Sequence, residues 1–193
     1  EATKTVLTYF EFGTVMAFLH FADIKPDWNV IEVGLGGRLD ATNLCRAQVS
    51  IITSISYDHQ EHLGSDIKQI AFEKASILKK DGTAFAHSKC QEVMDVIARI
   101  ARERQAKIHF LGKDFRVERK SFGETGQTFD FYGGHRVLEN LQISMLGHHQ
   151  IENAALAVAA CLEIDSRSGH IPEHVIKKGL NAARWEGRLE VVA

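Results

Sequence analysis

Near the start of the chain, apolar residues recur at about every third or fourth position, which is the spacing of an amphipathic helix. The pattern runs from Val6 to Ala22, and we expect this helix to pack on a sheet. The apolar positions are Leu7, Phe10, Val15, Phe18, Leu19 and Ala22. Residues 23–27 include Pro26 and should end the helix, because proline lacks the amide hydrogen that a helix interior requires.

Downstream, short runs of β-branched and apolar residues alternate with longer helical patterns. We predict buried strands at 29–33 and 49–55, each followed directly by glycine or polar residues. The alternation continues with a helix at 65–80, a strand at 83–86, a helix at 91–105 and a strand at 107–110. This order predicts a mostly parallel sheet with right-handed crossovers and helices on both faces.

The rhythm changes between residues 115 and 143, where short strands are separated by glycine-containing turns. Such a pattern predicts a small antiparallel β excursion. Helices at 150–162 and 172–183 follow, the second with Pro172 in its first turn. The predicted fold class is therefore α/β. A chain of 193 residues that is 45% hydrophobic should form one main domain.

Composition excludes several classes of partner. The formal net charge is -2 and the pI is about 6.6, so no overall basic field would attract nucleic acid or an acidic membrane surface. The longest apolar stretch, 154–162, is much shorter than a membrane-spanning helix, which needs about 20 residues. Three widely spaced cysteines, Cys45, Cys90 and Cys161, favour a reducing compartment and hence the cytoplasm.

Two polar residues, Glu32 and His59, lie at the carboxyl ends of predicted strands, the edge at which open α/β sheets bind ligands. A carboxylate inside an apolar strand needs a cation or a hydrogen-bond donor, because an unpaired buried one costs roughly several kcal/mol. A divalent metal ion is one such cation. A structural ion pair of Glu32 with Arg38 or Arg46 is the alternative.

His59 alone is weak evidence for a metal, because a histidine after a strand is more often an ordinary hydrogen-bonded residue. Magnesium also prefers oxygen ligands to imidazole. His62 would complete a His-x-x-His pair, but no cysteine pair or further nearby histidine supplies four zinc ligands. The residues themselves indicate a divalent ion and leave its identity open.

The glycines at 34–37 do not form a dinucleotide-binding loop, because Gly-x-Gly-x-x-Gly would require glycine at position 39, which is Leu39. A plain tight turn or a close backbone approach to a ligand remains open for them. The phosphate-loop motif Gly-x-x-x-x-Gly-Lys-[Ser/Thr] does not occur in the chain. The sequence starts at Glu1 without an initiator methionine or a signal pattern, so Glu1 looks like a cut point. If a nucleotide binds, we expect the loop that holds its phosphates to lie upstream of Glu1.

A longer signature covers residues 32–43, which read Glu-Val-Gly-Leu-Gly-Gly-Arg-Leu-Asp-Ala-Thr-Asn. This stretch resembles the signature of the folylpolyglutamate synthase and dihydrofolate synthase family, within the Mur ligase superfamily. Five further segments match the family in the same order along the chain: 7–12, 52–59 with 63–64, 73–77, 146–150 with 153–155, and 185–190. The resemblance implies that residues 1–193 are the central ATPase/ligase domain without its upstream phosphate loop, with 115–143 as an excursion. The C-terminal domain would also be absent.

The resemblance also implies roles for individual residues. Glu32 and His59 match magnesium ligands, and Lys74 matches a lysine whose carbamate helps to hold a second magnesium ion. His59 and carbamylated Lys74 would be the catalytic residues. Asn153 and Arg188 match residues that contact ATP. The residues that match the pterin- or folate-binding loops are Thr8, Tyr9, Phe10, Glu11, Leu39, Asp40 and Ala41.

The implied reaction joins L-glutamate to dihydropteroate or to a folate through an acyl phosphate, with ATP and Mg²⁺ as cofactors. We expect the 193-residue chain alone to be inactive and the full-length form to be a monomer. A non-catalytic pterin-binding or interaction module on the same scaffold is the alternative. A peptidoglycan-precursor Mur ligase would share the fold but would not be expected to carry the loop at 34–43.

Overall fold

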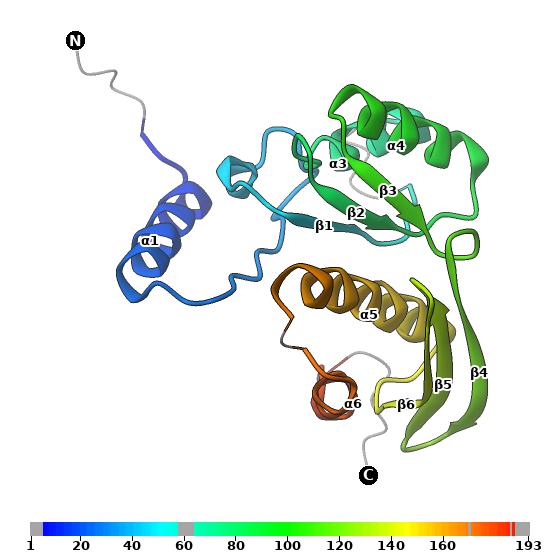
Figure 1. The fold of residues 1–193 in the computed structure, drawn as a ribbon. Coiled ribbons are helices and arrows are strands. Elements are labelled where there is room, and N and C mark those ends of the chain that lie inside the picture. Colours follow the sequence, from blue (N-terminus) through cyan, green and yellow to red (C-terminus); the bar gives the residue numbers. More distant parts are fainter. Residues whose placement is uncertain (1–5, 58–63, 170, 186, 188–193) are drawn as a thin grey trace.

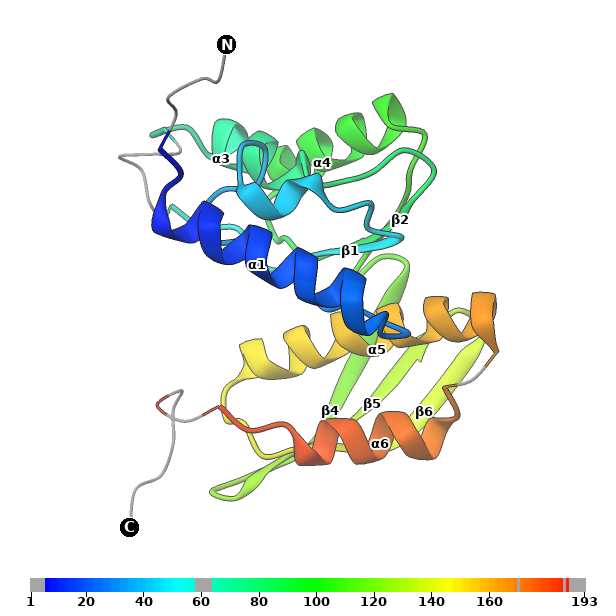
Figure 2. The same ribbon diagram turned by 90° about the vertical axis from the view of Figure 1, so that its left-hand side faces the viewer.

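The computed structural model describes residues 6–57, 64–169, 171–185 and 187. Within these residues there is a parallel sheet and an antiparallel sheet, each of three strands. One long helix contacts both sheets, as Figures 1 and 2 show. The α/β fold class and the antiparallel excursion predicted from the sequence are therefore confirmed.

The parallel sheet has the strand order β1-β2-β3. Its strands are β1 (Val49–Ile52), β2 (Thr83–Ala86) and β3 (Lys107–Phe110). The ranges predicted for β2 and β3 are correct, whereas β1 ends three residues earlier than the predicted 49–55. All four residues of the central strand β2 are buried, because helices cover it from both sides.

Helices α3 (Ile67–Ala75) and α4 (Gln91–Glu103) cover one face of this sheet, and α5 (His148–Ser168) covers the other (Figure 1). The buried residues of α4 follow the helical repeat and pack into the same core as Ala84 and Ala86 of β2. Helix α3 is shorter than the predicted 65–80. It begins after Asp66, whose side chain accepts a hydrogen bond from the Lys68 amide.

The antiparallel sheet consists of β4 (Phe115–Gly123), β5 (Gly126–Gly133) and β6 (Arg136–Ile143), in the order β4-β5-β6. Its apolar face packs on α5 and on α6 (Glu173–Ala182) to form the larger core. The fully buried side chains of this core include Phe129, Phe131, Leu138, Leu141, Ile151 and Leu156. Phe129 and Phe131 are two residues apart, so they lie on the same face of β5.

Helix α5 extends beyond the predicted 150–162 at both ends. Its last turns carry polar residues, and an i,i+4 ion pair between Glu163 and Arg167 supports them there, with a separation of 2.6 Å. The helix ends at Gly169, whose φ of 69° is the left-handed conformation that glycine adopts without a Cβ clash. Pro172 is the N-cap of α6 and so precedes its first turn.

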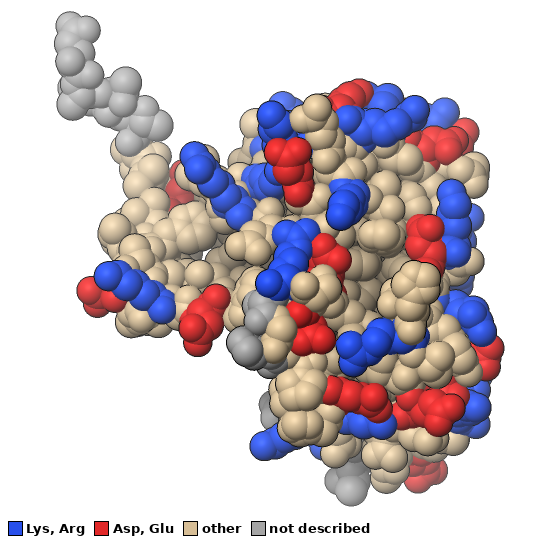
Figure 3. All heavy atoms as spheres, viewed as in Figure 1, with Lys and Arg blue, Asp and Glu red and all other residues tan. Residues whose placement is uncertain are grey.

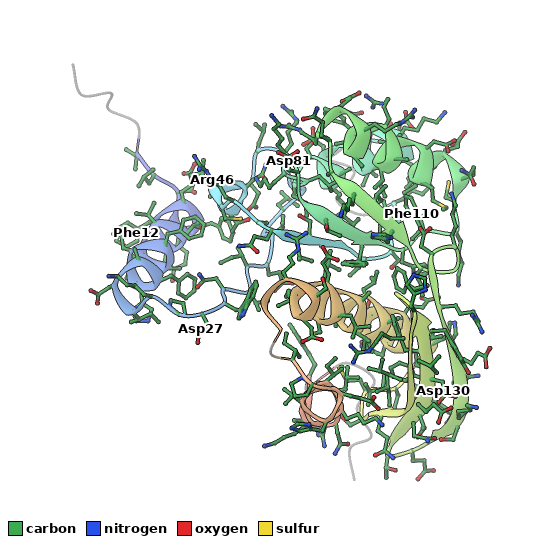
Figure 4. All side chains as sticks on the ribbon, viewed as in Figure 1. Phe12, Asp27, Arg46, Asp81, Phe110 and Asp130 are labelled. Carbon is green, nitrogen blue, oxygen red and sulfur yellow. The ribbon has the colours of Figure 1, made fainter. Side chains whose placement is uncertain are left out.

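Two predictions about the N-terminal region are wrong. Residues 29–33 form no strand, because they have no hydrogen-bonded strand partner among the described residues, and Val30 is 96% exposed. Helix α1 (Tyr9–Ile24) has no buried residue and does not pack on a sheet. It faces the short 3-10 helix η1 (Ala41–Leu44) across a cavity of about 400 Å³. Figure 4 shows Phe12 on α1, set apart from both sheets.

Acidic and basic side chains are interspersed on the face seen in Figure 3, without a large patch of one sign. This arrangement agrees with the near-neutral composition. In the described part of the chain, no helix combines the length and apolarity that crossing a membrane would require.

Candidate functional site

The loop at 34–40 lies directly against the C-terminal part of α3. At Gly37 the approach is so close that a Cβ would lie 2.7 Å from the Glu73 carbonyl oxygen and 2.9 Å from Ile77 Cγ2. The Arg38 amide donates to the same carbonyl at 3.0 Å, and Arg38 Nε lies 2.9 Å from Glu73 Oε1. Glycine is therefore needed at position 37 for the loop to reach the helix backbone.

Asp40 shapes the loop from inside. Its carboxylate accepts hydrogen bonds from the Leu35 amide at 2.9 Å, from the Thr42 amide at 2.9 Å and from the Thr42 hydroxyl. Partial burial by itself would raise the pKa of Asp40, but these hydrogen bonds together outweigh it and lower the pKa. The side chain also caps η1, so Asp40 is an ionised structural residue of the loop.

A second connection fixes the end of the loop. Lys79 Nζ donates to the backbone oxygen of Asn43 at 2.6 Å and to its side-chain oxygen at 2.7 Å. Asn43 Nδ2 in turn donates to the Arg38 carbonyl at 3.0 Å. Burial lowers the pKa of Lys79. Sequence reasoning missed Lys79, because a lysine after a helix belongs to no recognisable motif until the structure places Asn43 beside it.

The start of α1 approaches the same loop. Thr8 and Glu11 form a capping box, in which the Thr8 amide donates to Glu11 Oε2 at 2.7 Å and the Glu11 amide donates to Thr8 Oγ1 at 3.2 Å. The backbone hydrogen bond from Thr8 lowers the pKa of Glu11. A Cβ on Gly34 would overlap the ring of Phe10, so this ring lies directly on the loop backbone.

An open pocket of about 330 Å³ lies between these two segments. Its walls are Thr8, Phe10 and Glu11 from the start of α1, residues 35–41 of the loop, and Glu73 of α3. Six of the seven residues matched to pterin-binding loops thus line one pocket, although the two segments are about 30 residues apart in the sequence. Tyr9 does not line it and is 95% exposed.

The residues matched to metal ligands are only partly brought together. Glu32 is exposed, which contradicts the expectation of a carboxylate buried inside a strand. No ion pair joins Glu32 to Arg38 or Arg46 in the described part of the chain, because Arg38 pairs with Glu73 instead. The predicted alternative for Glu32 is therefore wrong in this structure.

Lys74 is half-buried on α3, and its Cα would lie 3.3 Å from a Cβ on Gly37, so the loop that follows Glu32 touches Lys74. Among the described residues, neither the Glu32 carboxylate nor the Lys74 ammonium group has a hydrogen-bond or ion-pair partner. No cluster of three or more His, Cys, Asp or Glu side chains that could bind a metal occurs within those residues. His59 lies outside the described residues.

Asn153 is exposed near the start of α5, and its amide lies 3.4 Å from Gln150 Oε1. Arg188 lies outside the described residues. The neighbouring Glu152 is buried and contacts His87, which directly follows β2. Sequence reasoning missed both residues, because they are 65 positions apart and neither belongs to a local motif.

The model of the Mur ligase middle domain matches residues 2–161. The chain belongs to this family. It is 35% identical over 187 residues to the dihydrofolate synthase/folylpolyglutamate synthase of Bacillus subtilis, covering 96% of this chain and 44% of that protein. The protein of the same name from Escherichia coli is also 35% identical, with 97% of this chain and 41% of the relative covered.

Solved structures agree with this family membership. The FPGS-AMPPCP-folate complex superimposes with a TM-score of 0.93 at 30% identity, covering 98% of this chain and 47% of that one. Folylpolyglutamate synthase from Thermotoga maritima gives a TM-score of 0.86 at 35% identity, covering 96% of this chain and 41% of that one. The resemblance drawn from the signature is confirmed. This member of the Mur ligase middle domain family spans less than half the length of these relatives.

Proposed function

We propose that this chain carries the pterin-binding and metal-binding part of a dihydrofolate synthase/folylpolyglutamate synthase. The reaction is the ATP- and Mg²⁺-dependent addition of L-glutamate to dihydropteroate or to a folate through an acyl phosphate. The observation that carries the proposal is the pocket between the start of α1 and the loop at 34–40, because it joins two separately matched segments beside Lys74. The relatives' names and the complex with AMPPCP and folate support it.

The pocket offers both apolar and polar contacts to a flat heterocycle. The Phe10 ring and the Leu39 side chain, which is 80% exposed, present apolar surface. Both Asp40 oxygens are engaged by the loop, so this carboxylate holds the shape of the pocket. Arg38 uses Nε for Glu73, which leaves its terminal nitrogens able to meet a substrate carboxylate.

The exposed Glu32 carboxylate has no hydrogen-bond or ion-pair partner in the described part of the chain, so its oxygens are available to a divalent ion. Glu32 and His59 would hold one Mg²⁺ ion, and a carbamate on Lys74 would help to hold a second. When bound, the ions would offset negative charge on the phosphoryl oxygens. Lys74 lies half-buried on α3, next to the loop that follows Glu32. Asn153 and Arg188 would contact ATP.

Cytoplasmic location, a monomeric full-length form and L-glutamate as the second substrate belong to the same proposal. The three cysteines are all free of disulfides, which supports a reducing compartment. Because the chain contains no phosphate-loop motif, we expect turnover only when the chain is extended upstream through such a loop.

A matched pair of leucine variants tests the pocket. Leu39→Ala removes an exposed side chain that lines the pocket, and Leu44→Ala removes one that is 81% exposed but lines the cavity beside α1. In calorimetric titrations with dihydropteroate, we expect Leu39→Ala to weaken binding about tenfold, and Leu44→Ala to change it less than about twofold. Equal effects of the two variants, or no binding by the unmodified chain, would contradict the proposed pterin site.

The pocket at the start of α1 would also serve one second candidate, a pterin-binding module without catalysis. Separate titrations of dihydropteroate and of Mg-AMPPCP into the chain extended upstream through a phosphate loop distinguish the two functions. The ligase function requires a response to both ligands, whereas the module would bind only the pterin.

A further inference from the structure

Helix α5 is attached to the central strand β2 by side chains at both of its ends. Near the C-terminal end of α5, Thr83 Oγ1 donates to Glu163 Oε1 at 2.8 Å and accepts from Arg167 Nη2 at 2.7 Å. Near the N-terminal end of α5, Glu152 lies beside His87. Thr83 begins β2 and His87 directly follows it, so α5 runs antiparallel to β2. The first turns of α5 therefore lie at the carboxyl end of the strand.

Three nitrogen atoms surround the Glu152 carboxylate. His87 Nδ1 lies 3.5 Å from Oε2, while Lys89 Nζ at 3.2 Å and His148 Nε2 at 3.5 Å approach Oε1. The side chains of Lys89 and His148 are 79% and 59% exposed, so solvent screens their contributions. His87 is buried at 7% exposure, so it is the partner that Glu152 contacts inside the protein.

The charge state of His87 follows from its surroundings. Burial lowers the pKa of His87, the Glu152 carboxylate opposes this shift, and Lys89 and His148 add to it. His87 is therefore a neutral imidazole at neutral pH. A neutral imidazole places no second charge beside the buried Glu152 carboxylate, with which it makes a polar contact at 3.5 Å.

The same first turns of α5 are held from the other side by β5. The buried Gln127 donates through Nε2 to the carbonyl oxygens of Met145 and Gly147, both at 2.9 Å. The Gln150 amide then donates to Gly147 at 3.1 Å, and Gln150 Oε1 lies 3.4 Å from the Asn153 amide. The side chain of Asn153 thus emerges from a turn that is fixed on two sides.

We propose that Glu152, in contact with His87, is a positioning residue that fixes the first turns of α5 at the carboxyl end of β2 and so orients the side-chain amide of Asn153 toward the nucleotide. This inference rests on the proposed function, in which Asn153 contacts ATP. Glu152 itself is buried, so it would act through the backbone of the residue that follows it.

The C-terminal end of α5 supplies a matched control. Glu163→Gln and Glu152→Gln each neutralise one carboxylate on the same helix that contacts β2 or the residue after it. The two positions are 11 residues apart, which is about 16 Å along the helix. If Glu152 had only a structural role, the two variants should bind the nucleotide with equal affinity.

The experiment combines amide hydrogen exchange with NMR titration of Mg-AMPPCP, both on the chain extended upstream through a phosphate loop. We expect Glu152→Gln to speed exchange of the amides at 150–156 and to weaken AMPPCP binding, each about tenfold. Glu163→Gln should leave AMPPCP binding within about twofold of the unmodified chain. Lys89→Ala, which removes only an exposed partner, should leave both quantities within about twofold.

His87→Gln is the second variant, because it loosens Glu152 without altering α5, and it should reproduce both effects of Glu152→Gln if that variant does not fold. Equal AMPPCP affinities of the Glu152 and Glu163 variants, or unchanged exchange at 150–156, would overturn the positioning role alone. Failure of the extended chain, without substitutions, to bind AMPPCP would overturn the nucleotide site of the proposed function and the role of Asn153 with it.

Discussion

Gly37 is the position at which the smallest possible side chain should disturb the candidate site most. In Gly37→Ala the new Cβ would meet the Glu73 carbonyl oxygen at 2.7 Å and Ile77 Cγ2 at 2.9 Å. Ordinary van der Waals contacts of a Cβ begin at about 3.4 Å, so the loop must retreat from α3 by roughly half an ångström or more. The nearer of the two atoms, the Glu73 carbonyl oxygen, belongs to the helix backbone, so it cannot move aside by a change of side-chain rotamer.

The magnitude follows from two contributions. Overpacking of this kind costs about 1–3 kcal/mol. Retreat also weakens the hydrogen bond from the Arg38 amide to the Glu73 carbonyl oxygen, which contributes about 0.5–1.5 kcal/mol. We therefore expect Gly37→Ala to lower the free energy of unfolding by roughly 2–4 kcal/mol. Affinity for dihydropteroate should fall as well, because the loop forms one wall of the pocket.

Equilibrium unfolding in urea measures this effect, with Gly179→Ala as the matched control. Gly179 lies in α6 with nothing within 4 Å of its Cβ position, so alanine there should raise the free energy of unfolding by about 0.5–1 kcal/mol. The two substitutions are chemically identical and should act with opposite signs. An unchanged or increased stability of Gly37→Ala would refute the argument that the loop is packed against α3.

Two further predictions concern stability. Phe129→Ala removes a fully buried ring between β5 and α5 and should cost about 3–5 kcal/mol in guanidinium unfolding, whereas Phe122→Ala, at 61% exposure, should cost less than about 1 kcal/mol. Burial holds the pKa of His87 below the value of about 6.5 found in unfolded chains. At pH values below about 6.5, the unfolded state therefore binds more protons than the folded state, and the free energy of unfolding falls as the pH drops. Stability curves from pH 5 to 8 should be flatter for His87→Gln, and an unchanged slope would contradict this origin.

The loop signature at 32–43 shows how far local sequence reaches in predicting the site. It indicated the family correctly, and its residues Leu39, Asp40 and Ala41 line the pocket, while their role in binding a pterin stays a prediction. It gave no sign of Lys79, whose ammonium group binds Asn43 from 36 residues away. The roles of Glu32, His59, Lys74, Asn153 and Arg188 stay predictions.

Sequence alone determined the elements whose pattern is local. Strands β2 and β3 and most of α4 were predicted because their apolar periodicity, turn residues and length lie within a few neighbouring positions. The same reasoning failed for 29–33, since a strand exists only when another segment pairs with it. Only the tertiary structure brought Gly37 onto Glu73 and Glu152 against His87, because burial and side-chain pairing depend on how the chain crosses from one element to the next.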